Sequence, residues 1–413
     1  MNRLVQLSLT RSARVLVSVL VCLLGCECGL AAAQGTQPAS ESPYRPKDPL
    51  NAVAFDRFYN LDFDRAVQDY EKVVEKYPDD PFAMNHLLTG VLFRELYRMG
   101  ALNTREYEND SFLNAPHHNA DPKAKEHIKQ LVNRALRLEQ KRLQANPKDV
   151  GALYARGVTR AQFATYTALI EHAWFSALRN AVGARHDHEK VLELAPDYAD
   201  AKLVVGAHNY VLGSLPWGVK VAASIVGLGG SKEKGLQLLR EAAGGGGEAA
   251  VDAKVLLIVF LRREHQYEEA LELDRILVKQ YPQSSLLALE EGNLLRAMGK
   301  RQEAAASYRR IWKSGREGHY PGQRYELAAL ALGDLLRSQK DHEGAAGAYE
   351  LVNQLQQPDP ELKQKASLSA GEMYDVLRKR DLAIKKYQEV IALNSGNGPA
   401  ESARKFMKDA YRE

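Results

Sequence analysis

The sequence predicts an all-α protein, a solenoid of about seven stacked helical hairpins. Two observations predict it, and both come from a pattern that occurs four times in residues 251–393. First, an alanine follows twelve residues after a small or apolar residue, as in the pairs Ile258 and Ala270, Gly292 and Ala304, Gly333 and Ala345, Gly371 and Ala383. Second, Asp274, Tyr308, Tyr349 or Tyr387 stands four residues after the alanine, and Leu277, Ile311, Val352 or Val390 stands seven after it.

The physical reason for this pattern is helix packing. Small residues let two antiparallel helices approach closely where they cross, and residues four and seven positions on lie on the same helical face. The alanines are 34, 41 and 38 residues apart, and Pro282 lies twelve residues after Ala270. A period near 34 with these features resembles the tetratricopeptide repeat (TPR). The resemblance implies a right-handed superhelix of hairpins that are stable only as a stacked set.

Residues 1–33 are typical of a signal peptide. Arg3, Arg11 and Arg14 form a basic start, residues 15–24 form an apolar stretch too short to span a membrane, and three alanines end at Ala33. All three cysteines of the chain lie in this segment. We expect cleavage near Ala33 and an exported, periplasmic or secreted protein, with residues 34–49 as a disordered linker.

Two alternatives for the N-terminus remain open. The residues before Cys26 resemble a bacterial lipobox, which would give an envelope-assembly lipoprotein acylated at Cys26. The other is an uncleaved anchor helix. Loss of residues 1–33, which hold three arginines and one glutamate, lowers the net charge from +4 to +2. That balance gives no electrostatic reason to expect nucleic acid or an anionic membrane surface as a partner.

The mature chain divides into an N-terminal TPR-like region, 50–247, and a C-terminal array, 248–413. The first region opens with a full repeat at Ala54, Ala66, Tyr70, Val73 and Pro78. Three central hairpins keep the register across insertions, with Gly90 matched to Ala135, Gly157 to Ala184 and His188, and Gly206 to Gly235. We expect residues 101–121 to be a loop and 163–181 to be helical, and 399–411 to form a capping helix.

The resemblance also places a binding surface. In TPR proteins the first helix of each hairpin lines the concave groove, and the matching polar positions here are Arg262, Glu290, Asn293, Arg296, Asp334, Arg337 and Glu372. Alternating arginine and acidic side chains suit an extended peptide or a helix of a partner protein. The alternative is that these residues are only solvated polar positions on helix faces.

A membrane contact is a separate hypothesis. Residues 214–230 are apolar and begin with a Leu-Pro-Trp sequence, so Trp217 could touch lipid, as could an acylated Cys26. Such a segment more often folds back into the core. Lys220 is also its single charge, whereas interfacial helices usually carry a basic face.

No motif predicts catalysis, a cofactor or a metal. His117, His118, His186 and His188 invite a metal interpretation, but residues two apart on a helix point in different directions, and His188 takes the aromatic packing position of its repeat. The glycine-rich stretches lack the strand and the Gly-Lys-Ser/Thr ending of a phosphate loop. We therefore expect a non-catalytic protein-interaction scaffold of the cell envelope, with an enzyme using a cryptic histidine site as the remaining alternative.

Overall fold

The computed structural model describes residues 48–103, 119–215, 220 and 229–413. The chain divides into two units, Met1–Tyr281 and Pro282–Glu413. Several predictions fall outside the described residues: the signal peptide 1–33, Cys26, almost all of the linker 34–49, His117, His118, Trp217, and most of the insertions 101–121 and 214–230.

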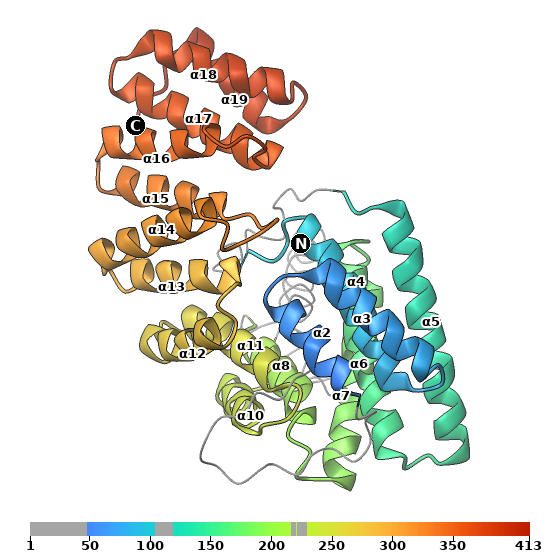
Figure 1. The fold of residues 1–413 in the computed structure, drawn as a ribbon. Coiled ribbons are helices and arrows are strands. Elements are labelled where there is room, and N and C mark those ends of the chain that lie inside the picture. The colour runs from blue at the N-terminus through green and yellow to red at the C-terminus, as the bar shows by residue number, and fades with distance from the viewer. Residues whose placement is uncertain (1–47, 104–118, 216–219, 221–228) are drawn as a thin grey trace, which may run out of the picture. The chain divides into compact units, whose positions relative to one another are not determined.

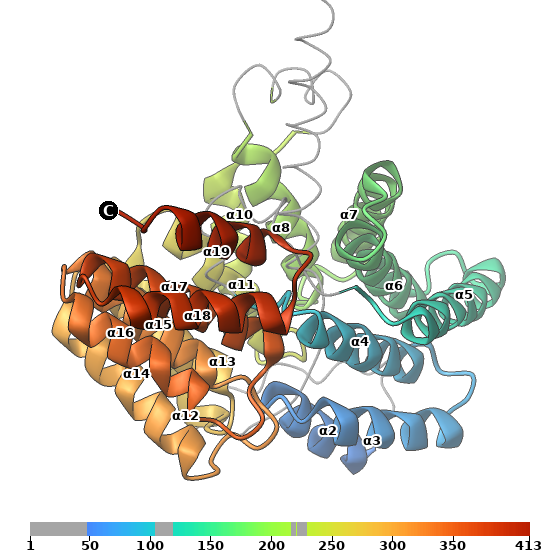
Figure 2. The same ribbon diagram turned by 90° about the horizontal axis from the view of Figure 1, so that it is seen from above.

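The described part of the first unit consists of ten helices in five antiparallel pairs (Figure 1). The helices are α2 (Pro49–Tyr59), α3 (Phe63–Lys76), α4 (Pro81–Arg98), α5 (Pro122–Ala145), α6 (Val150–Leu169), α7 (Trp174–Leu194), α8 (Ala201–Gly213), α10 (Lys232–Gly244), α11 (Ala250–Arg263) and α12 (Tyr267–Gln280). Figure 2 shows α4, α5, α6 and α7 each beside the next. The hairpin α11–α12, which the sequence analysis grouped with the C-terminal array, belongs to this unit.

The described second unit has seven helices, arranged as three pairs and a capping helix in chain order (Figure 1). They are α13 (Ser285–Ala297), α14 (Arg301–Arg316), α15 (Glu326–Ser338), α16 (His342–Asn353), α17 (Pro360–Val376), α18 (Arg380–Leu393) and α19 (Gly398–Lys408). The described residues thus contain eight pairs, where the sequence suggested about seven. The predicted cap at 399–411 corresponds to α19, whose Ala400 and Ala403 are fully buried.

Local sequence explains where the helices begin and end. Asp48, Asp80, Asp121 and Asp359 cap helices that begin with proline, and each accepts backbone hydrogen bonds from the first turn. The first helices of most hairpins end in the same turn, in which a residue with positive φ follows the helix. His265, Lys340 and Arg378 hold this position with φ between 58° and 62°. The next residue then donates back to the helix, as Asp341 N does to Leu336 O at 3.0 Å.

The small residues of the predicted pattern face their partners in the core. Ala304, Ala345 and Ala383 are fully buried. A Cβ atom built on Gly292, Gly333 or Gly371 would lie 2.3–2.6 Å from Cε1 of Tyr308, Tyr349 or Tyr387. Two of the three predicted matches across the central insertions also hold, because a Cβ on Gly157 would meet the ring of His188 at 2.3 Å and one on Gly206 would meet Gly235 O at 3.0 Å.

Gly90 packs differently from its prediction. Ala135 is fully buried on α5, but the ring that lies against Gly90 is that of Tyr70 on the preceding helix, α3. The position four residues after Ala135 holds Glu139 instead of an aromatic residue, so α5 has no ring to place there. The predicted helical stretch 163–181 is also interrupted, since α6 and α7 are long arms joined by a turn at residues 170–173.

Within the first unit, α2 packs against a helix from the far end of that unit. Tyr59 Oη on α2 donates a hydrogen bond to Asp252 Oδ1 on α11 at 2.9 Å, in a buried position. The ring of Tyr59 also lies 4.8 Å from the ring of Tyr281. Close by, Nε2 of the buried His86 lies 3.3 Å from Glu248 Oε2. The first and fifth hairpins of this unit are therefore in contact.

Candidate functional site

The first helices of the hairpins form the inner side of the second unit. The pairs α13 with α15 and α15 with α17 contact each other more extensively than do the second helices α14, α16 and α18. In a curved stack, the side on which successive helices approach more closely is the concave side that repeat proteins use for binding. Six predicted partner-binding residues lie on these helices, and we call them the inner row: Glu290, Asn293, Arg296, Asp334, Arg337 and Glu372.

The repeat itself positions part of the inner row. Asn293 and Asp334 directly follow the packed glycines Gly292 and Gly333. The hydroxyl of the tyrosine that packs on each glycine donates a hydrogen bond to the residue after that glycine. Tyr308 donates to Asn293 Oδ1 at 2.9 Å, and Tyr349 donates to Asp334 Oδ1 at 2.8 Å. The geometry that the two hairpins share thus fixes the direction of two side chains of the inner row.

Glu290 and Asn293 form the buried end of the inner row. Their exposed fractions are 3% and 1%, and Asn293 Nδ2 donates to Glu290 Oε2 at 3.3 Å. Side chains with so little exposure have few atoms available to a partner. Both residues support the fold from inside. They are therefore not the solvated polar residues on a helix face that the sequence analysis gave as the alternative.

Arg337 joins two neighbouring hairpins of the second unit. Its Nη1 lies 2.7 Å from Glu372 Oε2, so α15 and α17 are joined by an ion pair. Burial opposes the charge of Arg337, but its interactions with Glu372, Tyr411 and Glu413 together outweigh burial and raise the pKa of the guanidinium. The arginine therefore keeps its charge and can hold further acceptors. Two such acceptors, Tyr411 and Glu413, come from the end of the chain.

The two other predicted arginines are Arg296 and Arg262. Arg296 on α13 is half-buried and reaches the surface. Arg262 lies on α11 of the first unit, where its exposed fraction is 5%. The structure thus brings together Asp334, Arg337 and Glu372.

Sequence reasoning missed Asp375. It stands four residues after Gly371, the same position that Arg296 and Arg337 hold after their glycines, so the repeat register was a usable signal. Its carboxylate accepts from Tyr387 Oη at 2.8 Å and from Arg380 Nη1 at 2.8 and 2.9 Å. With Asp375, the polar positions extend over the last hairpin, where both of them, Glu372 and Asp375, are acidic.

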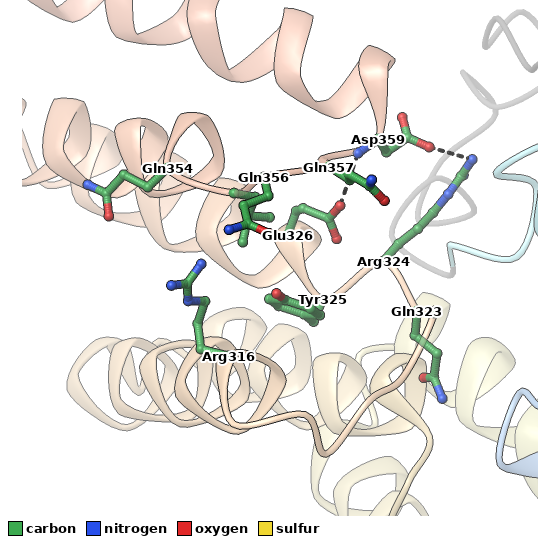
Figure 3. Close-up of a pocket in the computed structure, with 11 residues that line it drawn as sticks. Arg316, Gln323, Arg324, Tyr325, Glu326, Gln354, Gln356, Gln357 and Asp359 are labelled. Carbon is green, nitrogen blue, oxygen red and sulfur yellow. Dashed lines mark hydrogen bonds and ion pairs between the residues drawn. The ribbon is translucent and has the colours of Figure 1, made fainter.

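A cavity of about 700 Å³ opens at the opposite end of α15. Figure 3 shows the loops before and after α15–α16 around it, with Glu326 and Arg324 turned toward Asp359. Its lining residues are Arg316, Gly322, Gln323, Arg324, Tyr325, Glu326, Gln354, Leu355, Gln356, Gln357 and Asp359. Because Glu326 and Arg337 stand eleven residues apart on one helix, about 16 Å of α15 separates this cavity from the Arg337 end.

Polar side chains of both signs line this cavity. Arg324 Nη2 pairs with Asp359 Oδ2 at 2.8 Å, and the backbone N–H of Asp359 donates to Glu326 Oε1 at 3.1 Å. Burial raises the pKa of Glu326. The exposed Arg316 also lines the cavity, together with the exposed glutamines Gln354, Gln356 and Gln357. These side chains could hydrogen-bond a polar ligand or a peptide backbone, and the arginine adds one cation.

The histidines raised in the sequence analysis are packing or surface residues where the structure describes them. His188 is fully buried, its ring lies against Gly157, and its Nδ1 donates to Ala184 O at 2.8 Å. Burial lowers the pKa of His188 to about 4. His186 is exposed. Among the described residues, no three His, Cys, Asp or Glu side chains gather closely enough to hold a metal ion.

Comparison with known families gives three matches. The model of the Iml2/Tetratricopeptide repeat protein 39 family matches residues 198–319, and two tetratricopeptide repeat models match residues 289–360 and 58–80. The chain is a tetratricopeptide repeat protein. None of the three matching models describes an enzyme domain. No curated protein matches this TPR chain.

Several solved structures are similar to this TPR protein. The human IFIT1 dimer with m7Gppp-AAAA is 15% identical, with 97% of this chain and 87% of that chain covered and a TM-score of 0.40. The structure titled for Pseudomonas aeruginosa pilF is 18% identical over 60% of this chain and 98% of that one, with a TM-score of 0.34. YrrB, described as a TPR protein with an unusual peptide-binding site, is 16% identical over 65% and 97%, with a TM-score of 0.29.

None of the described helices is both long enough and apolar enough to cross a bilayer.

Proposed function

We propose that this TPR protein is a non-catalytic scaffold that holds a segment of a partner protein along the inner row of its second unit. The observation that carries the proposal is the position of Arg337. It lies on the inner side of the stack, pairs with Glu372, and donates to acceptors that lie outside the repeats. Charged side chains of both signs along a concave surface fix the alignment in which an extended segment binds.

Hydrogen-bond chemistry favours an extended partner segment. Arg337 presents a planar fork of N–H donors, which suits carboxylate and hydroxyl acceptors. Asp375, in the last turn of the next first helix, α17, presents acceptor oxygens, which suit backbone N–H groups. An extended segment satisfies both residues if its backbone N–H groups bind Asp375 and its acidic or hydroxyl side chains bind Arg337.

A co-purification experiment tests this function. Arg296→Gln with Arg337→Gln removes both inner arginines without placing a new carboxylate beside Glu372. The matched control is Arg309→Gln with Lys385→Gln, which removes two exposed cations from the second helices α14 and α18. We expect a protein that co-purifies with the wild-type and control chains to fall at least about 10-fold in yield with the inner variant, at unchanged helical content by circular dichroism. Equal yields from both variants would contradict the assignment.

We also propose that the chain works in the cell envelope after export. The support is the sequence of residues 1–33, with its basic start, short apolar stretch and alanine ending. The mass of the mature N-terminus tests it. A chain that begins near Gln34 fits cleavage by export, an acylated Cys26 fits the lipoprotein alternative, and an intact Met1 would contradict both.

A further inference from the structure

The last five residues of the chain run back along the inner side of the second unit. Helix α19 ends at Lys408, and the backbone N–H of Tyr411 donates to Asp375 Oδ2 on α17 at 2.8 Å. This bond uses the main chain of residue 411 and so does not depend on its side chain. It places residues 409–413, which we call the tail, across the polar positions of the last two hairpins.

Two side chains of the tail then reach Arg337. Tyr411 Oη accepts a hydrogen bond from Arg337 Nη2 at 2.6 Å, and Glu413 Oε1 accepts one from Arg337 Nε at 3.0 Å. The Arg337 guanidinium also lies 5.3 Å from the centre of the Tyr411 ring, within the range of a cation–π contact. The other oxygen of Glu413 lies 3.8 Å from His342 Nε2. The tail therefore supplies a hydroxyl, a ring and a carboxylate to one arginine.

The tail differs from the capping helix in how it is held. α19 buries Ala400 and Ala403 completely and packs against Tyr387 and Val390, so it is part of the core. In the tail, Ala410, Arg412 and Glu413 are exposed, and Tyr411 is half-buried. Loss of the tail would thus expose little apolar surface.

The groups that the tail touches keep partners without it. Arg337 remains paired with Glu372, and Asp375 remains bonded to Arg380 and Tyr387. Leaving a buried charge unpaired is the main cost of breaking such contacts, and that cost does not arise here. The tail can therefore exchange with an equivalent segment at low cost.

We propose, building on the scaffold function above, that the tail occupies the place of the partner's segment and that this segment repeats its chemistry. The segment carries an aromatic hydroxyl side chain followed two residues later by a carboxylate, a Tyr-x-Glu or Tyr-x-Asp sequence in extended conformation. Asp375 holds its backbone, and Arg337 reads the hydroxyl and the carboxylate. The tail competes with it from within the same molecule.

Competition of this kind has a measurable size. A segment tethered by a few residues acts at an effective concentration on the order of millimolar. The apparent Kd of a ligand equals its intrinsic Kd divided by the fraction of sites that are open. If the tail leaves at most about a tenth of the sites open, a free segment binds the wild-type chain at least about 10-fold more weakly than a chain whose tail is released.

The experiment uses the full-length chain and a fluorescein-labelled peptide of residues 408–413, followed by fluorescence anisotropy. Tyr411→Ala with Glu413→Ala, the release variant, removes both side chains that hold the tail on Arg337 and leaves only the main-chain bond to Asp375. We expect this release variant to bind the peptide at least about 10-fold more tightly than the wild type, and the added change Arg337→Gln to abolish that gain. A control peptide with alanine in place of its tyrosine and glutamate should not bind. If the release variant unfolds, Tyr411→Phe with Glu413→Gln keeps the ring against Phe406, whose centre lies 5.1 Å away.

Two outcomes would overturn the inference. A peptide that fails to bind the folded release variant would show that the tail is only a structural cap. A peptide that binds the wild type and the release variant equally would show that the tail does not block the site. Either result leaves the scaffold function standing if the inner variant Arg296→Gln with Arg337→Gln still loses the co-purifying protein, so the two proposals fail separately.

Discussion

The ring of Tyr349 lies against Gly333 so closely that a Cβ atom on residue 333 would stand 2.3 Å from Tyr349 Cε1. The same tyrosine donates a hydrogen bond to Asp334, the next residue of α15. One contact therefore sets both the spacing of the two helices and the direction of an inner-row side chain. Gly292 with Tyr308 repeats this arrangement one hairpin earlier.

Gly333→Ala is expected to destabilise the chain by about 1–3 kcal/mol, because the added methyl group must displace a fully buried ring. Gly347→Ala is the matched control, since residue 347 lies within α16 and a Cβ there meets nothing within 4 Å. Alanine's higher helix propensity should make that variant as stable as the wild type or up to about 1 kcal/mol more stable. Urea denaturation of both variants measures the difference, and equal midpoints would contradict the packing described.

Tyr59→Phe tests the contact between the first and fifth hairpins of the first unit. The change removes the hydroxyl that donates to the buried Asp252 and should cost about 1–3 kcal/mol, the usual penalty for taking a donor from a buried acceptor. Tyr267→Phe removes an exposed hydroxyl contact, to His265, and should change the free energy of unfolding by less than about 0.5 kcal/mol. A Tyr59→Phe chain as stable as the control would mean that this contact does not hold α2 in place.

Much of the fold follows from periodicity, because each hairpin must pack on its neighbours. The match of Gly157 with His188 could be predicted although Gly157 and Ala184 are 27 residues apart. Where a ring packs at a helix crossing, the facing helix needs a small residue. The contact of Tyr59 with Asp252 could not. The two residues are 193 positions apart, and a repeat pattern specifies contacts between adjacent hairpins only.

The candidate site was predictable in part for the same reason. Repeat register places Arg337 and Glu372 on first helices, and the structure joins them. The repeat register says nothing about a segment beyond the last repeat, so it did not predict the contacts of Tyr411 and Glu413 with Arg337. Register alone also suggested that Glu290 and Asn293 are open to a partner, although neighbouring helices bury them.

Glu139 shows another departure from the repeat, a fully buried carboxyl in an aromatic position. Thr159 Oγ1 lies 2.5 Å from Glu139 Oε1 and 2.7 Å from Asn85 Oδ1. Asn85 Nδ2 donates to Ala155 O, which turns its Oδ1 toward the threonine. One hydroxyl has one proton to donate, so a protonated Glu139 that donates to Thr159 satisfies both contacts. Burial agrees with this geometry and raises the pKa of Glu139 to about 8.

This proton makes stability depend on pH. The folded chain keeps the Glu139 proton up to about pH 8, whereas a glutamate in the unfolded chain loses it near 4.5. The folded state therefore binds the extra proton in this window, and the free energy of unfolding falls as pH rises through it, by at most about 1.4 kcal/mol per pH unit. Glu139→Gln, which keeps a donor toward Thr159, should remove this decline.

The measurement is urea denaturation between pH 5 and 8.5 for the wild type, Glu139→Gln and the control Glu126→Gln, which changes an exposed residue of the same helix. The stability of Glu139→Gln relative to the wild type should rise with pH, while Glu126→Gln should follow the wild type. Parallel curves for all three chains would show that Glu139 is ionised in the fold.

Site-specific photo-cross-linking decides whether the partner lies along the first helices of the second unit. A photoreactive phenylalanine analogue replaces Arg296 on α13 in one full-length chain and Arg309 on α14, the second helix of the same hairpin, in another. The account predicts that the co-purifying protein cross-links from position 296 and not from position 309. Cross-linking from position 309 alone would contradict it.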